Sequence, residues 1–225
     1  MAAGVEWAGL DRISTAERVA GILRDQIETG KLKPGTKLSE EEITTGLGIS
    51  RNTLREAFRL LVHERLLEHR FNHGVTVRMV GLDDLRDLYQ VRRVIECSAV
   101  RGVTELSDTA RTRLHEAVLD AQDAAKEGRW ADVGTANLRF HQAIVGMIGS
   151  PRIDEVMRRV WAELRLVWHV LDDPRTSFER YISVNSELLD LLLIGDFTRA
   201  EKVLKTYLTS AEKQFVAAYA EASHR

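Results

Sequence analysis

Apolar residues recur every three to four positions along most of this chain, which is the spacing of one face of an α-helix. After Gly81 the pattern is divided by short breaks of glycine, proline and aspartate, which are typical helix stops and caps. It predicts six helices, at about residues 83–105, 108–127, 130–148, 152–171, 177–194 and 198–221. Connections this short favour antiparallel neighbours, so this part of the chain is expected to form an all-α antiparallel helical bundle.

The first 80 residues have a different pattern. Serines open three shorter helical segments, at residues 14–28, 39–46 and 50–62. Between residues 66 and 80 the period changes to two around a turn signal, as in a β-hairpin. This order of elements is that of a winged helix-turn-helix. The sequence therefore predicts a mainly α protein, with a winged helix-turn-helix in residues 1–80 and the helical bundle in residues 81–225.

The charge of the chain is nearly balanced, with 32 basic and 34 acidic side chains and a net charge of −2. Taken alone, this balance argues against a nucleic-acid-binding protein, because such proteins usually carry a basic signature. The positive charge is local, however, since six arginines face only three glutamates between residues 50 and 78. A groove-binding surface needs such a local concentration.

Several classes of protein are excluded or disfavoured by what the sequence lacks. Cys97 is the only cysteine, so an intrachain disulfide or a thiolate zinc cluster cannot form. The first residues do not resemble a secretion signal, and the longest apolar stretch is too short to cross a bilayer, so we expect a cytoplasmic protein without a membrane partner. The common catalytic and nucleotide-binding motifs do not occur, which argues against an enzyme.

The third helical segment has the side chains of a DNA-reading helix. Ser50 is placed to cap it, which puts Arg51, Asn52 and Arg55 on its first turns, the part that enters the major groove in helix-turn-helix proteins. Arginine bonds guanine and asparagine bonds adenine in a bidentate manner, whereas Ser50 and Thr53 suit phosphate contacts. A solvated helix face is the alternative interpretation of these residues.

This region resembles the GntR family of bacterial regulators. The matching pieces follow one another in the family order: Leu38-Ser39-Glu40, Leu47-Gly48-Ile49-Ser50-Arg51, Arg55-Glu56-Ala57-Phe58, Leu66-Leu67 and His73-Gly74. The resemblance implies that His73 and Gly74, in the wing, approach the minor groove. One departure is the acidic run of residues 40–42, where relatives often carry a basic phosphate contact. We therefore expect more of the electrostatic affinity to come from Arg51, Arg55, Arg59 and Arg70.

The second part of the chain resembles the FCD effector-binding domain of the FadR subfamily, in its shorter VanR-like branch. The resemblance rests on three pieces, which are Tyr89-x-Val-Arg92-x-x-x-Glu96, Phe140-His141 and Gly195-Asp196-x-x-x-Ala200. Many such domains bind a divalent metal through one aspartate and three histidines. Here the resemblance gives Asn137, His141, Asn185 and Tyr207 at those positions, so only His141 is retained. Amides and a phenol are poor ligands, and we expect neither a metal nor another cofactor.

The same four residues are expected to form a polar cluster inside the bundle, which is either a satisfied structural network or an effector site. Arg92 matches a position that often points into the effector cavity, where it would clamp a carboxylate. We thus expect a ligand-responsive repressor that binds a palindromic double-stranded operator as a homodimer and senses a small organic acid or related metabolite. The alternative is an effector-independent dimeric regulator whose C-terminal domain only dimerises.

Overall fold

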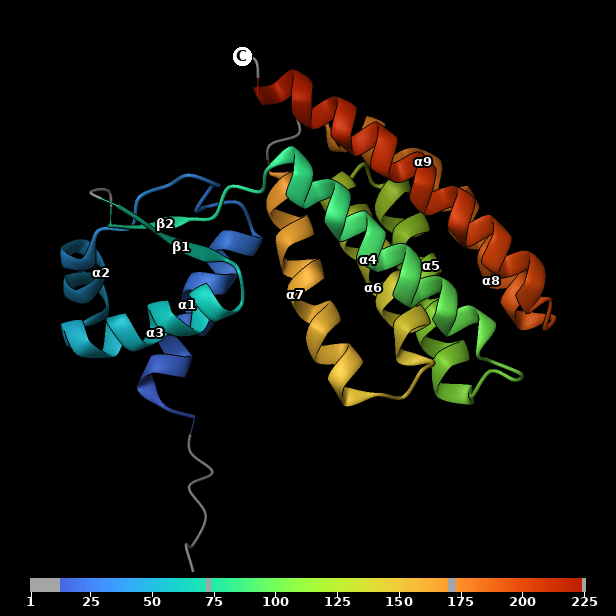
Figure 1. The fold of residues 1–225 in the computed structure, drawn as a ribbon, viewed down its shortest axis with the longest axis horizontal. Helices are drawn as coiled ribbons and strands as arrows, with labels where there is room; N and C mark the ends of the chain where they lie inside the picture. The colour runs from blue at the N-terminus through green and yellow to red at the C-terminus, as the bar shows by residue number, and fades with distance from the viewer. Residues whose placement is uncertain (1–12, 72–73, 170–172, 224–225) are drawn as a thin grey trace, which may run out of the picture. The chain divides into compact units, whose positions relative to one another are not determined.

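The computed structural model describes residues 13–71, 74–169 and 173–223. The chain divides into two compact units, residues 1–78 and 79–225, and the division lies two residues before the predicted boundary. Helices dominate both units, and the only sheet among the described residues is a two-stranded hairpin (Figure 1). The predicted mainly α fold, a helix-turn-helix unit followed by a helical unit, is confirmed.

The N-terminal unit contains three helices and the hairpin: α1 (Thr15–Glu28), α2 (Glu40–Leu47), α3 (Arg51–His63), β1 (Leu67–Arg70) and β2 (Gly74–Val77). The serines cap the helices as predicted, and Ser14 and Glu17 form a complete capping box at α1. The helical periodicity of α1 and α3 buries one face of each helix, and the two helices pack together. The strands are antiparallel, with Leu67 opposite Val77 and Arg70 opposite Gly74.

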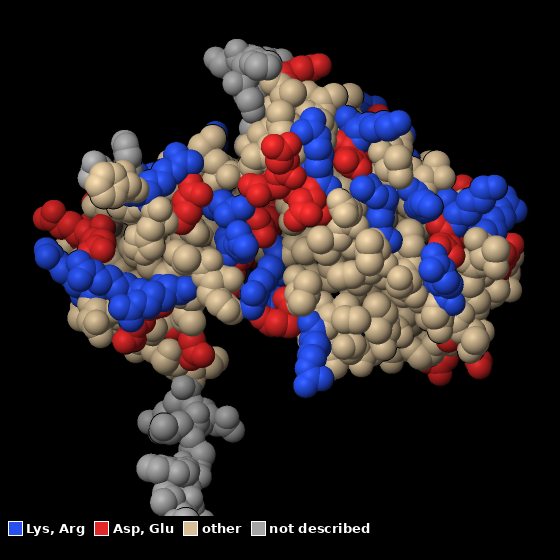
Figure 2. Space-filling view, in the orientation of Figure 1, with Lys and Arg blue, Asp and Glu red and all other residues tan. Residues whose placement is uncertain are grey.

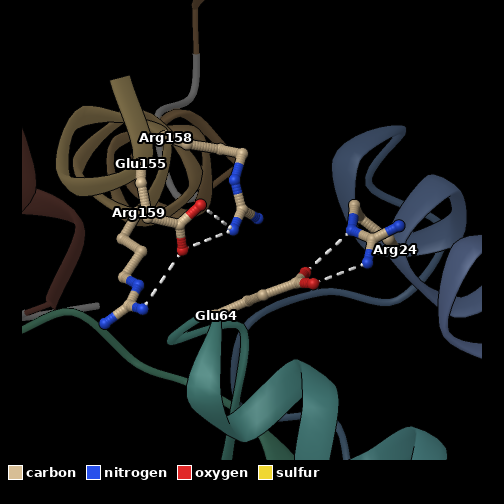
Figure 3. Close-up of polar contacts among 5 residues, drawn as sticks. All are labelled: Arg24, Glu64, Glu155, Arg158 and Arg159. Carbon is tan, nitrogen blue, oxygen red and sulfur yellow. Dashed lines mark hydrogen bonds and ion pairs between the residues drawn. The ribbon is translucent and has the colours of Figure 1, made fainter. Parts of the chain in front are cut away.

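An ion pair also joins α1 to the end of α3. Arg24 donates two hydrogen bonds to the Glu64 carboxylate, from Nε at 2.8 Å and from Nη2 at 2.7 Å (Figure 3). The hydrogen bonds that Arg24 donates to Glu64 raise the pKa of Arg24 above its ordinary value. A bidentate pair fixes orientation as well as distance, so this pair holds α3 in place relative to α1.

The C-terminal unit consists of the six predicted helices: α4 (Leu82–Arg101), α5 (Asp108–Lys126), α6 (Trp130–Gly146), α7 (Pro151–Trp168), α8 (Pro174–Leu193) and α9 (Phe197–Ser223). The closest pairings are α5 with α6 and α4 with α9 (Figure 1). Gly134 of α6 allows α8 to approach, since a Cβ atom there would lie 2.9 Å from the ring of Phe178. In Figure 3, Glu155 accepts hydrogen bonds from Arg158 and Arg159 along the surface of α7. Within the described ranges, no helix is long and apolar enough to span a membrane.

Candidate DNA-reading surface and effector site

The start of α3 has the geometry expected of a recognition helix. Gly48 ends α2 in the left-handed conformation, with φ at 64°, which lets the chain turn sharply into α3. The Ser50 side chain accepts the backbone N–H of Thr53 at 3.1 Å, and the two hydroxyls lie 2.9 Å apart. Both hydroxyls therefore help to begin the helix, and a phosphate contact would have to be made in addition to these bonds.

The cations of α3 are not equally free to bind DNA. Arg51 and Arg59 are exposed, and neither forms an ion pair with another described residue. Arg55, by contrast, donates from Nε and Nη2 to the two carboxylate oxygens of Glu40, each at 3.3 Å, although its side chain remains 60% exposed. Asn52 is also exposed and donates a long hydrogen bond of 3.4 Å to Glu56. Arg51 is thus the cation of the first turn of α3 that is exposed without an ion pair among the described residues.

The charge on this unit is segregated. Figure 2 shows basic side chains in a row over the region of α3, with acidic side chains beside them in the region of α2. Glu40, Glu41 and Glu42 form the first turn of α2, where the helix dipole stabilises negative charge. The acidic run therefore stabilises the start of its own helix, and Glu40 also pairs with Arg55.

The wing is the β1–β2 hairpin. Gly74 opens β2 with φ at 81°, a conformation that glycine adopts without strain, whereas His73 lies outside the described residues. Lys37 lies beside β2, forming an isolated bridge with Thr76. The sequence patterns did not point to Phe71, because a lone aromatic residue in a polar turn carries no periodicity. Its side chain is 91% exposed directly after β1.

The effector-site candidates meet in the interior of the C-terminal unit. Arg92 of α4 donates from Nε to Oε1 of Glu96, one turn further along, at 2.7 Å. The other carboxylate oxygen, Oε2, lies 2.6 Å from Nδ1 of His141 on α6. The guanidinium also lies over the rings of Tyr89 and Trp161, at 5.0 and 4.9 Å from their centroids. Arg92 thus already has a carboxylate partner, and the sequence motif alone did not identify Glu96 as that partner.

These contacts determine which of the Arg92, Glu96 and His141 side chains are charged. Burial disfavours the Glu96 carboxylate, but Arg92 and His141 outweigh burial and hold its pKa below the ordinary value. Burial lowers the pKa of His141, even though Glu96 opposes this effect. The stable state is therefore a charged Arg92–Glu96 pair beside a neutral imidazole. Because an ionised carboxylate only accepts hydrogen bonds, Nδ1 of His141 carries the proton and Nε2 carries a lone pair.

The three remaining candidates form the second half of the cluster. Oδ1 of Asn137 accepts hydrogen bonds from Nδ2 of Asn185 at 2.8 Å and from the Tyr207 hydroxyl at 3.1 Å. The rings of Tyr207 and His141 are 4.9 Å apart, which joins the two halves. The structure thus brings together all five predicted residues. We refer to them and Glu96 as the interior cluster: Arg92, Glu96, Asn137, His141, Asn185 and Tyr207.

Two buried atoms of the interior cluster have no hydrogen-bond partner among the described residues, namely Nε2 of His141 and Oδ1 of Asn185. Their residues are 0% and 3% exposed. Both atoms are acceptors, given the proton positions above. A buried acceptor without a donor costs about 1–3 kcal/mol, so each such atom in a folded protein requires an explanation.

A groove of about 540 Å³ on the surface of α8 and α9 reaches the edge of the interior cluster. Tyr207 lines the groove while its hydroxyl bonds Asn137, and Tyr181 packs against it with the ring centroids 4.5 Å apart. Arg180, Arg199 and Lys202 are also in the lining. The two tyrosines therefore separate the groove from the interior cluster.

The interior cluster does not fit a divalent metal. Among the described residues, no group of three His, Cys, Asp or Glu side chains is arranged to hold one. Oδ1 of Asn137 already accepts two hydrogen bonds, and burial raises the pKa of the Tyr207 hydroxyl well above its ordinary value. Only the lone pair of His141 remains as a good donor, and one donor does not bind zinc tightly. That the protein binds no divalent metal remains a prediction.

Comparison with known protein families identifies both domains. Residues 15–77 match the model of the bacterial regulatory proteins of the gntR family, and residues 87–210, more than half of the chain, match that of the FCD domain. This chain belongs to the GntR family. It is 28% identical over 159 residues to the Nta operon transcriptional regulator of Aminobacter aminovorans, which covers 70% of this chain and 76% of the relative.

Solved structures of other regulators are similar to this GntR chain. A GntR transcriptional regulator from Rhodococcus sp. RHA1 is 44% identical, with a TM-score of 0.86 over 91% of this chain and 98% of that chain. McbR/YncC of E. coli is 25% identical, with a TM-score of 0.75 over 93% and 99% of the two chains. The chain is accordingly a DNA-binding transcriptional regulator with an FCD domain, not an enzyme.

Proposed function

We propose that this GntR regulator is a repressor that releases its operator when a small molecule enters the interior cluster. It acts as a homodimer on a palindromic site, because one winged helix contacts too few base pairs for genomic specificity and paired half-sites mirror a two-fold protein. Arg51 and Asn52 supply the base contacts, and Arg59 adds electrostatic affinity. Arg55 reads DNA only after its bond to Glu40 is exchanged for one to DNA.

One observation carries the effector proposal: two buried acceptors, Nε2 of His141 and Oδ1 of Asn185, lack donors. Nothing else in the bundle that the structure describes gathers polar groups of three helices around such atoms. A ligand that supplies the two missing donors would recover the free energy that the unbound protein forgoes. The groove between α8 and α9 offers a path, which opens when Tyr181 and Tyr207 move apart.

The chemistry of these acceptors narrows the ligand class. A carboxylate would place lone pairs against lone pairs at both atoms, and the cation that could hold it, Arg92, is already neutralised by Glu96. A neutral hydroxyl-bearing ligand, such as a polyol or sugar, donates to both acceptors without introducing charge. We therefore favour a neutral polyol over the organic acid that the resemblance alone implies.

The second candidate function is an effector-independent regulator whose FCD domain only dimerises. The bonds of Glu96 to Arg92 and His141, and those of Asn137 to Asn185 and Tyr207, favour it, because a network that is largely complete needs no ligand. In that case internal waters would supply the two missing donors.

The test is a thermal-shift and operator-release assay on the full chain. The operator is first selected from random DNA, and the panel pairs five- and six-carbon polyols with the mono- and dicarboxylates of the same skeletons. We expect a polyol to raise the melting temperature and release the operator, because a ligand that binds only the native state stabilises it by mass action. Asn185→Leu should abolish the shift, and the exposed substitution Glu179→Gln on the same helix should not.

The outcomes separate the two functions. Binding of carboxylates alone would overturn the ligand class and leave the effector role intact. If no panel member shifts the protein or its operator affinity, the effector role fails and the dimerisation role stands.

A further inference from the structure

Phe71 is the exception among the phenylalanines of this chain. The sequence has six, of which Phe58, Phe140, Phe178 and Phe215 are buried and Phe197 is partly buried. Phe71 is 91% exposed, more than any other large apolar side chain on the described surface. An aromatic ring held in water forgoes the free energy of burial, which a partner that covers the ring would recover.

The place is the wing. In the hairpin register Arg70 and Gly74 are the last pair, and Phe71 is the first residue of the connection beyond it. The ring therefore stands at the end of the hairpin, where the wing of a winged helix-turn-helix is nearest to DNA. Packing within the chain does not hold it there, since nearly all of its surface is open.

The surroundings of Phe71 favour DNA as the partner over another protein. Arg70 precedes it and is 44% exposed in its side chain while paired with Glu68. Lys37 runs alongside Gly74, with its Cε about 4.0 Å from where a Cβ atom would lie, and has no ion pair among the described residues. A hairpin end with an apolar ring beside cations is complementary to a groove bounded by phosphates and floored by base edges.

We propose that Phe71 is an apolar wedge that enters the minor groove beside the wing and partly unstacks one base step of the operator. Apolar side chains used in this way kink DNA toward the major groove, and flexible pyrimidine–purine steps kink at the lowest cost. Phe71 then contributes specificity through DNA deformability, in addition to the base contacts of α3. The family resemblance of the wing concerns His73 and Gly74, whereas the exposure and position of its ring distinguish Phe71.

The test compares Phe71→Ala, Phe71→Leu and the wild-type full chain on operators selected from random DNA. Fluorescence anisotropy gives the affinity, energy transfer between dyes at the two DNA ends gives the bend, and permanganate reactivity reports unstacked thymines. We expect Phe71→Ala to lose about tenfold in operator affinity, the equivalent of burying part of a ring, with a smaller bend and loss of the reactive thymine. Phe71→Leu should retain most of the affinity, the bend and the thymine reactivity, because leucine is also an apolar wedge.

Ile22→Ala is the matched control, since Ile22 is 43% exposed on α1 of the same unit. It should leave affinity and bend unchanged. Wild-type affinity and bend in Phe71→Ala would overturn the proposal. A loss of affinity with an unchanged bend and unchanged thymine reactivity would also overturn it, because the ring would then contact the backbone without entering the stack.

Discussion

Replacing Glu96 by glutamine tests whether the charge inside the interior cluster stabilises the FCD domain. Glutamine keeps the shape and an acceptor oxygen, so the substitution removes chiefly the negative charge. It leaves the Arg92 guanidinium buried, with a side chain only 5% exposed and its ionic partner gone. Breaking a buried pair from one side costs about 3–5 kcal/mol, because the remaining charge is uncompensated.

For a helical unit spanning residues 79–225, a loss of this size lowers the melting temperature by roughly 10–15 °C. Urea unfolding followed by the tryptophan fluorescence of the FCD domain, together with calorimetry, measures both quantities. Glu179→Gln is the control, because the Arg175–Glu179 pair has the same i, i+4 spacing but side chains 60% and 53% exposed. It should change the free energy of unfolding by less than about 0.5 kcal/mol.

A double substitution tests whether the effect of Glu96→Gln comes from the lost charge or from altered packing. If Arg92 and Glu96 are both replaced by methionine, no buried charge remains, and the protein should lose less stability than Glu96→Gln alone. The reasoning is refuted if Glu96→Gln costs no more than the surface control.

Four further predictions concern the two sites. Arg51→Ala and Arg55→Ala should each weaken operator binding about 10- to 100-fold at fixed salt with unchanged helical circular dichroism, and unchanged affinity would show that α3 is not the reading helix. Protein purified without chelator should contain no stoichiometric divalent metal by elemental analysis; about one metal per subunit, lost in His141→Ala, would contradict this. Sedimentation should give a dimer at micromolar concentration, and a monomer with and without DNA would count against a palindromic operator. Because burial lowers the pKa of His141 from its ordinary 6.5, the unfolded chain binds more protons, so stability is complete above about pH 6.5 and falls below it; His141→Gln should reduce this dependence in urea titrations.

The helices were predictable because their signals are local. The six helices of the FCD domain begin and end within about four residues of the predicted limits, since glycines, prolines and aspartates mark the breaks. The serine caps of α1, α2 and α3 were predictable for the same reason. The gathering of Asn137, Asn185 and Tyr207 came from the family resemblance, because no local pattern relates residues on three different helices.

The partners of charged side chains could not be predicted in this way. Arg55 and Glu40 are fifteen residues apart, and Glu96 and His141 are forty-five apart, so only the fold brings them together. The i, i+4 spacing of Arg92 and Glu96 permits an ion pair, but the sequence does not tell whether the pair is buried and so withdrawn from ligands. The contacts with Glu40 and Glu96 change the predicted roles of Arg55 and Arg92, and those roles remain predictions.

The interior cluster is polar although three positions at which the family resemblance implies metal ligands carry Asn137, Asn185 and Tyr207. Where aspartate and histidines are replaced by Asn137, Asn185 and Tyr207, the buried groups are neutral and bond each other, and the single retained His141 is held by Glu96. Arg92 balances Glu96, so the cluster has no net charge to offer a ligand. Recognition must then depend on hydrogen-bond complementarity, for which a missing partner is severely penalised. A regulator of this kind should discriminate between ligands by the placement of their hydroxyl groups more than by their charge.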